Sequence, residues 1–227
     1  MGDAKAEKAG RLSILDKLVL EKFKAWAVPK VPLWLETYHL TLLTVAWSLG
    51  IIACGWLAYK YSNLNWFWLS SFFIFMQWVT DVLDGSVGRE RNTGLIRWGF
   101  FMDHFLDYIL LCSILISYSF TLPSNYINYS LFTLMIIGAF MVNSYLYFGA
   151  VGKFKINYYG FGPTEVRAAF IIFNAIVIFA TPAQLAPFFP WALGAAIAGL
   201  IFVVYNEQRD IWEMDMKEKK KGKKNNS

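Results

Sequence analysis

The sequence predicts an all-α integral membrane protein with six transmembrane helices, preceded by an N-terminal interfacial amphipathic helix. Hydrophobic residues make up 57% of the 227 residues and charged residues only 16%, which is too little polar surface for a soluble domain of this size. The apolar residues also gather in runs of about 20, the helical length that crosses a bilayer core of about 30 Å. A soluble globular protein is therefore excluded.

The six apolar runs are separated by short connectors rich in turn-forming residues. We expect spans at Tyr38–Tyr59, Trp66–Val87, Ile96–Phe120, Tyr126–Val151, Val166–Thr181 and Phe188–Tyr205. The chain then divides into a leading segment, one six-helix membrane domain and a basic tail. The expected boundaries are 1–37, 38–206 and 207–227.

The basic residues predict the orientation of the chain. All but one of the 21 Lys and Arg residues lie before the first span, around the second and fourth connectors, or after the sixth span; Lys60 is the exception. Since cytoplasmic loops carry the excess of Lys and Arg, both termini are expected in the cytoplasm.

The segments that flank the spans have patterns of their own. Before the first span, apolar residues recur at steps of three and four and form one stripe along a helix: Leu12, Leu15, Val19, Phe23 and Trp26. We interpret this segment as a helix at the headgroup level, with a soluble helix packed on a partner as the alternative. The Lys-rich tail is expected to be a disordered segment attracted to anionic lipid.

Four carboxylates lie in or near two consecutive spans, where an unpaired charge is costly. Asp81 and Asp84 end the second span, and Asp103 and Asp107 begin the third. Residues three and four apart share one face of a helix, so each pair forms a stripe. Because a short connector makes the two spans antiparallel, both pairs are expected to face each other near the cytoplasmic surface.

Converging carboxylates repel one another strongly outside bulk water, and two hard divalent cations would neutralise them. Oxygen-only ligands favour magnesium, manganese or calcium over zinc, and two such ions can assist a phosphoryl displacement. Gly85 and Gly99 leave room for a diphosphate near the backbone, and Arg89 can neutralise phosphate oxygens. Wetted interface groups or a proton pathway are the alternatives for these acids.

The spacing of these residues resembles a known signature. The run Asp81-Val-Leu-Asp84-Gly85-Ser-Val-Gly88-Arg89 is followed, after nine residues, by Gly99-Phe-Phe-Met-Asp103-His-Phe-Leu-Asp107. It is similar to the D-x-x-D-G-x-x-A-R and G-x-x-x-D-x-x-x-D motifs of the CDP-alcohol phosphotransferase family, with seven of eight fixed positions matched. Gly88 replaces the usual alanine. Tyr38 and Thr37 stand where many members have Asn and Pro, before the threonine matching Thr41.

The resemblance implies a role for each matching residue. Asp81, Asp84, Asp103 and Asp107 would bind two Mg²⁺ or Mn²⁺ ions, and Asp107 would also be the catalytic base. Gly85, Arg89 and Gly99 would contact the cytidine diphosphate. The implied reaction transfers a substituted phosphate from a CDP-linked alcohol to a hydroxyl, releases CMP and makes a phospholipid. One substrate would be a lipid, the active site would face the cytoplasm, and the enzyme would form a homodimer; no nucleic acid is expected.

Other residues have two interpretations each. His104 lies about 100° around the helix from Asp103 and is either a packing residue or part of the site. Glu165 either caps a helix start or lines the site. Lys153, Lys155 and Arg167 either hold an anionic acceptor or lipid, or anchor the topology. Cys54 and Cys112 are read as packing residues.

Two other functions were weighed against a phosphotransferase. An intramembrane prenyltransferase would have more spans, a longer chain and its second acidic motif far downstream. A cation or proton transporter would place carboxylates near the midplane and often has repeated halves.

The substrates remain open between two classes. Asp103-His104 with Asp107, and Thr164-Glu165-Val166, resemble the choline and ethanolamine phosphotransferases, which favours a CDP-amino alcohol donor and a diacylglycerol-like acceptor. The alternative is a CDP-diacylglycerol-dependent phosphatidyltransferase that acts on a small polar alcohol.

Overall fold

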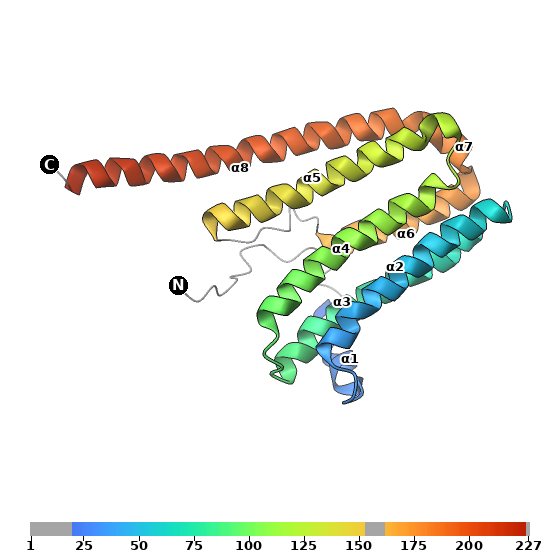
Figure 1. The fold of residues 1–227 in the computed structure, drawn as a ribbon, viewed down its shortest axis with the longest axis horizontal. Helices are drawn as coiled ribbons and strands as arrows, with labels where there is room; N and C mark the ends of the chain where they lie inside the picture. Colours follow the sequence, from blue (N-terminus) through green and yellow to red (C-terminus); the bar gives the residue numbers. More distant parts are fainter. Residues whose placement is uncertain (1–19, 153–161, 226–227) are drawn as a thin grey trace.

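The computed structural model describes residues 20–152 and 162–225, and within these ranges it contains helices and no strand (Figure 1). Six helical stretches of the described chain are long and apolar enough to cross a membrane. They are built on α2 (Thr37–Lys60), α3 (Trp66–Glu90), α4 (Ile96–Ser119), α5 (Ile127–Val151), α6 (Pro163–Ala180) and α8 (Phe189–Asn225). The predicted fold class and number of spans are thereby confirmed.

Short helices join or extend these spans. The 3-10 turn η3 (Ser124–Tyr126) leads into α5. After α6, α7 (Pro182–Leu185) and η4 (Ala186–Phe188) lead into α8, and prolines at their first turns start each new helix. The observed ends of α2 to α6 lie within three residues of the expected spans.

The helices α2, α3, α4 and α6 surround one apolar core, while α5 packs on α4 and α8 lies along α5 (Figure 1). Gly55 lets α2 approach α4 closely, since a Cβ at this position would lie 2.4 Å from the Ser117 carbonyl oxygen. The core around this contact includes Ile51, Phe67 and Ile114, which are at most 1% exposed.

A buried polar network joins α4, α6 and α3. The Tyr118 hydroxyl donates to Asn174 Oδ1 at 2.7 Å, and Asn174 Nδ2 donates to Ser71 Oγ at 3.0 Å. All three residues are buried, so every one of these bonds lies away from water. The network fixes the relative positions of the three helices that carry the charged residues of the candidate site.

The segment before the first span packs on α3. Its described part comprises α1 (Glu21–Ala27) and η2 (Val28–Lys30), and the Phe23 ring stacks on Trp78 with centroids 5.4 Å apart. Arg91, which follows α3, donates to the carbonyl of Val31 at 2.8 Å. The predicted amphipathic helix is therefore present in its last turns, while Leu12, Leu15 and Val19 lie outside the described residues.

The expectation of a disordered tail is wrong for the described residues, because α8 continues as a helix to Asn225. The physical reason lies in the first turns beyond the span. Glu213 pairs with Arg209 at 3.9 Å and with Lys217 at 3.8 Å, both at the four-residue spacing that stabilises a helix. Between Tyr205 and Lys221 there is neither proline nor glycine, so no residue interrupts the helix.

Candidate active site

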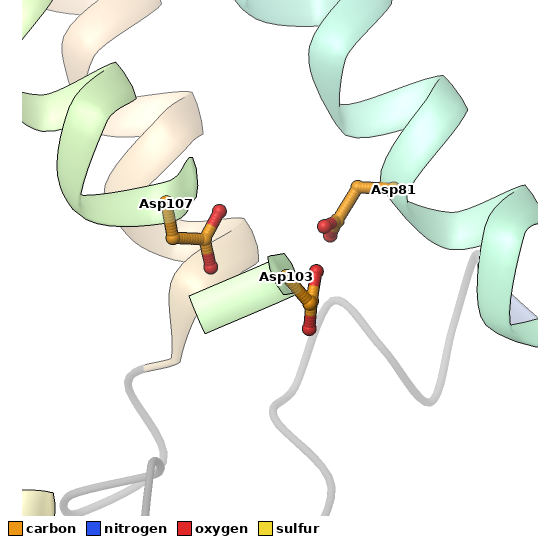
Figure 2. Close-up of side chains that lie close together, drawn as sticks. All are labelled: Asp81, Asp103 and Asp107. Atoms are coloured by element: carbon orange, nitrogen blue, oxygen red, sulfur yellow. The ribbon is translucent and has the colours of Figure 1, made fainter. Parts of the chain in front are cut away.

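Three carboxylates from two helices converge at the centre of the candidate site. Asp81 of α3 and Asp103 and Asp107 of α4 each offer an oxygen atom, and these atoms lie within 4.8 Å of one another (Figure 2). Asp103 and Asp107 share a face of α4 because they are four residues apart. The structure therefore brings Asp81 of the first predicted stripe next to both members of the second.

The electrostatic cost of this arrangement is high. Two like charges about 4 to 5 Å apart repel by about 3 to 4 kcal/mol at an effective dielectric constant of about 20. Three ionised groups give three such repulsions, and the side chains retain only part of their contact with solvent. The cluster needs positive charge to persist as carboxylates.

Arg167 of α6 supplies one such charge. Its Nη1 lies 3.1 Å from Asp81 Oδ2, and its Nη2 donates to Asp107 Oδ1 at 2.6 Å. The guanidinium thus bridges a carboxylate of α3 and one of α4, and Arg167 is only 6% exposed. The sequence alone allows Arg167 to be an anion-binding residue or a topology anchor, and neither interpretation includes a contact with the aspartates.

A usable signal for Arg167 was present in the sequence. The residue falls inside the expected span Val166–Thr181, and a charged side chain inside a span requires a partner. The same rule singles out the carboxylates. Applied to Arg167, it predicts an ion pair between Arg167 and these aspartates.

Asp84 lies on the same helix as Asp81 but outside the 4.8 Å group. It is buried, and its Oδ2 accepts a hydrogen bond from the Thr41 hydroxyl of α2 at 2.7 Å. This hydrogen bond joins residues that are 43 positions apart in the sequence. It orients the Asp84 carboxylate and ties the start of α2 to the site.

The residues that resemblance assigns to the nucleotide lie along the end of α3 and the start of α4. The guanidinium of Arg89 folds over Gly85, so that a Cβ at Gly85 would lie 3.3 Å from Arg89 Nη1. Gly99 has open space where a Cβ would be. Gly99 thus leaves its backbone uncovered, as a bulky diphosphate near the helix would require, whereas the Arg89 side chain lies over Gly85.

His104 contacts Asp103 and the backbone of its own helix. Its Nδ1 lies 2.7 Å from the Phe100 carbonyl and 3.5 Å from Asp103 Oδ2, and the Tyr145 hydroxyl of α5 donates to the His104 carbonyl at 3.2 Å. The histidine therefore connects the carboxylate cluster to α5. This geometry is compatible with a role in the site and with a purely positional one.

An apolar groove of about 850 Å³ runs between α4 and α5 beside His104. Its walls are almost entirely aromatic and aliphatic, and they include Phe101, Phe105, Met135, Gly138, Val142 and Tyr145. The groove therefore offers room for a hydrocarbon chain next to the acidic cluster.

Glu165 caps the start of α6. Its Oε2 accepts a hydrogen bond from the Gly162 backbone N–H at 2.9 Å, the reciprocal contact expected of an acidic residue in a first helical turn. This agrees with the capping interpretation of Glu165, and a further role in the site stays a prediction.

The donor set fits a hard divalent cation. The three convergent groups are all carboxylates, the ligand type that magnesium and manganese prefer, and neither cysteine is among them. Asp81, Asp103 and Asp107 are therefore the described residues best placed to hold an ion, with Asp84 next to them on α3.

The six apolar helices and this cluster define a multi-pass membrane protein with a group of carboxylates that could hold a hard cation. The family model for CDP-alcohol phosphatidyltransferase matches residues 38–205, and the chain belongs to this family. Its members transfer a substituted phosphate from a CDP-alcohol in lipid synthesis, and this is the reaction class of the chain. Searches of curated proteins and of solved structures found no match.

Two of the three departures from the family pattern meet in space. Gly88 stands where alanine is usual, and Thr37 stands where proline is frequent. A Cβ at Gly88 would lie 3.0 Å from Thr37 Oγ1, which is tighter than ordinary van der Waals contact, and Thr37 is buried. The glycine thus makes room for the threonine between α3 and the start of α2.

This contact predicts that Gly88→Ala destabilises the protein by about 1 kcal/mol through overpacking. Thr37→Ala should relieve the contact, so the double variant should recover most of the loss. Thermal unfolding of the four proteins in detergent measures the coupling. Equal losses from Gly88→Ala with and without Thr37→Ala would contradict it.

Proposed function

We propose that the chain is a metal-dependent phosphotransferase that uses a CDP-linked amino alcohol, of the choline or ethanolamine type, and a diacylglycerol-like acceptor. The observation that carries the lipid acceptor is the apolar groove between α4 and α5 beside His104. His104 touches Asp103, so a chain in the groove would hold its headgroup close to the carboxylates. Two Mg²⁺ or Mn²⁺ ions held by the four aspartates are part of this proposal.

The position of the groove supports a lipid acceptor over a lipid donor. The groove is walled by α4 and α5, whereas two of the three residues proposed to contact the nucleotide, Gly85 and Arg89, belong to α3; the third, Gly99, lies at the start of α4. A lipid in the groove would lie between α4 and α5, with its headgroup near His104 and thus near Asp103. An uncharged lipid hydroxyl would also need no additional anion site. The short resemblances around His104 and Thr164 agree with this substrate class.

The proposed chemistry is a displacement at phosphorus. The acceptor hydroxyl gives its proton to Asp107, its oxygen bonds to the phosphorus that carries the alcohol, and the bond from that phosphorus to the CMP oxygen breaks. Asp107 accepts a hydrogen bond from Arg167 through Oδ1, which would hold its carboxylate in place for the proton transfer. Bound divalent ions would supply charge neutralisation for the diphosphate. Positioning of the two substrates would supply much of the remaining rate.

We also propose that both termini and the active site face the cytoplasm, on the support of the distribution of Lys and Arg. The homodimer implied by the family resemblance belongs to the same proposal.

The function is tested by incubating the purified protein with a panel of CDP-alcohols and acceptors and identifying products by mass spectrometry. CDP-choline or CDP-ethanolamine with diacylglycerol should give phospholipid and CMP. Chelation should stop CMP release, and Mg²⁺ or Mn²⁺ should restore it. Product from CDP-diacylglycerol and a small alcohol alone would reverse the choice of substrates, and full activity without metal would contradict the metal proposal.

The proposed base gives a second prediction. Asp107→Asn should lower turnover by about 100-fold or more, because a carboxamide cannot accept the proton, while CDP-alcohol binding stays near that of the parent protein. Single-turnover CMP release and equilibrium binding in detergent measure the two effects. Near-normal turnover by a folded Asp107→Asn protein would remove Asp107 from this role.

The groove gives a third prediction. Gly138→Leu should raise the KM for the lipid acceptor several-fold and leave the KM for the CDP-alcohol unchanged, because the larger side chain fills the groove beside Tyr108. Gly149→Leu on the same helix is the matched control, since Gly149 is exposed and has open space at its Cβ position. Equal effects of the two substitutions would exclude the groove as the acceptor site.

A further inference from the structure

We infer that Arg167 is a built-in counter-cation, which competes with divalent metal ions for the carboxylates of the active site. The inference rests on the proposed metal site and concerns how this site is regulated. Arg167 contacts two of the three carboxylates that form the candidate metal group, Asp81 at 3.1 Å and Asp107 at 2.6 Å. An ion placed among these carboxylates would meet the guanidinium there.

The position of Arg167 makes this contact specific. A surface arginine could swing into water, but Arg167 is 6% exposed and projects from α6 between α3 and α4. A buried charge is stable only when it is paired with an opposite charge, and Arg167 is paired with two carboxylates. The planar guanidinium offers several N–H donors in a fixed geometry, so it can hold both carboxylates at once.

Two consequences follow for the metal-free and metal-bound protein. Without metal, Arg167 offsets part of the repulsion among the carboxylates and holds α3 and α4 to α6. With metal, its positive charge lies next to the incoming ion and opposes binding, so the guanidinium releases at least one carboxylate when the site fills. Arg167 therefore lowers the affinity of the site for metal ions and stabilises the metal-free form of the site.

A positional residue without this competition would behave differently. If Arg167 only arranged the aspartates, its loss would disorder the ligands and weaken metal binding. If it competes, its loss removes a repulsive charge and strengthens metal binding. The direction of the change in affinity thus separates the two roles.

The experiment measures Mn²⁺ binding to the full-length protein in detergent by electron paramagnetic resonance, together with thermal unfolding in chelator and in saturating Mn²⁺. Arg167→Gln should bind Mn²⁺ about tenfold more tightly than the parent protein. It should unfold at a lower temperature in chelator and recover in Mn²⁺. Arg167→Lys, which keeps the charge, should stay nearer the parent protein in both measurements.

Arg97→Gln is the matched control. It removes an exposed positive charge at the start of α4, the end of the helix that carries Asp103, and should leave Mn²⁺ affinity unchanged. Unchanged or weaker Mn²⁺ binding by Arg167→Gln, or a loss of stability that Mn²⁺ does not restore, would overturn the inference. Absence of Mn²⁺ binding in the parent protein and in every variant would instead overturn the proposed metal site, and the inference with it.

Discussion

One guanidinium between two carboxylates joins three membrane helices, and the arrangement of the bundle depends on this charge balance. Asp81, Asp103 and Asp107 lie too close together to remain ionised without nearby positive charge. Arg167 reaches two of them, Asp81 and Asp107, from the start of α6. The start of α6 is therefore held by the chemistry of the site as well as by the core.

Other hydrogen bonds between the helices also fix the positions of α2 and α6 relative to α3 and α4. Thr41 fixes Asp84 from α2, and Asn174 connects α6 to both α3 and α4 through Ser71 and Tyr118. Hydrogen bonds between membrane helices are individually worth about 1 kcal/mol, so none of these alone determines the fold. Together they restrict how α2 and α6 lie against the helix pair that carries the aspartates.

Much of this could be predicted from the sequence, because its strongest signals are local. Runs of apolar residues identified the six spans, and the spacing of Asp81, Asp103 and Asp107 placed them on helix faces that do converge. The bridge made by Arg167 was missed, since its partners lie 60 or more residues away and its neighbours Lys153 and Lys155 resemble topology anchors. The helical tail was not predicted because a high lysine content is typical of disordered segments, whereas the ion pairs of Glu213 and the absence of proline favour a helix here.

Different helices contribute different parts of the site, and the family signature includes residues of only two of them, α3 and α4. The signature covers the end of α3 and the start of α4, which hold the four aspartates and the glycines Gly85 and Gly99. The groove needs only apolar volume from α5, and many side chains supply this equally well. The charge balance needs one long cationic side chain on α6, here Arg167, and no particular residues beside it in the sequence. The charge balance and the α5 wall of the groove therefore depend on residues that lie outside the signature, on α6 and α5.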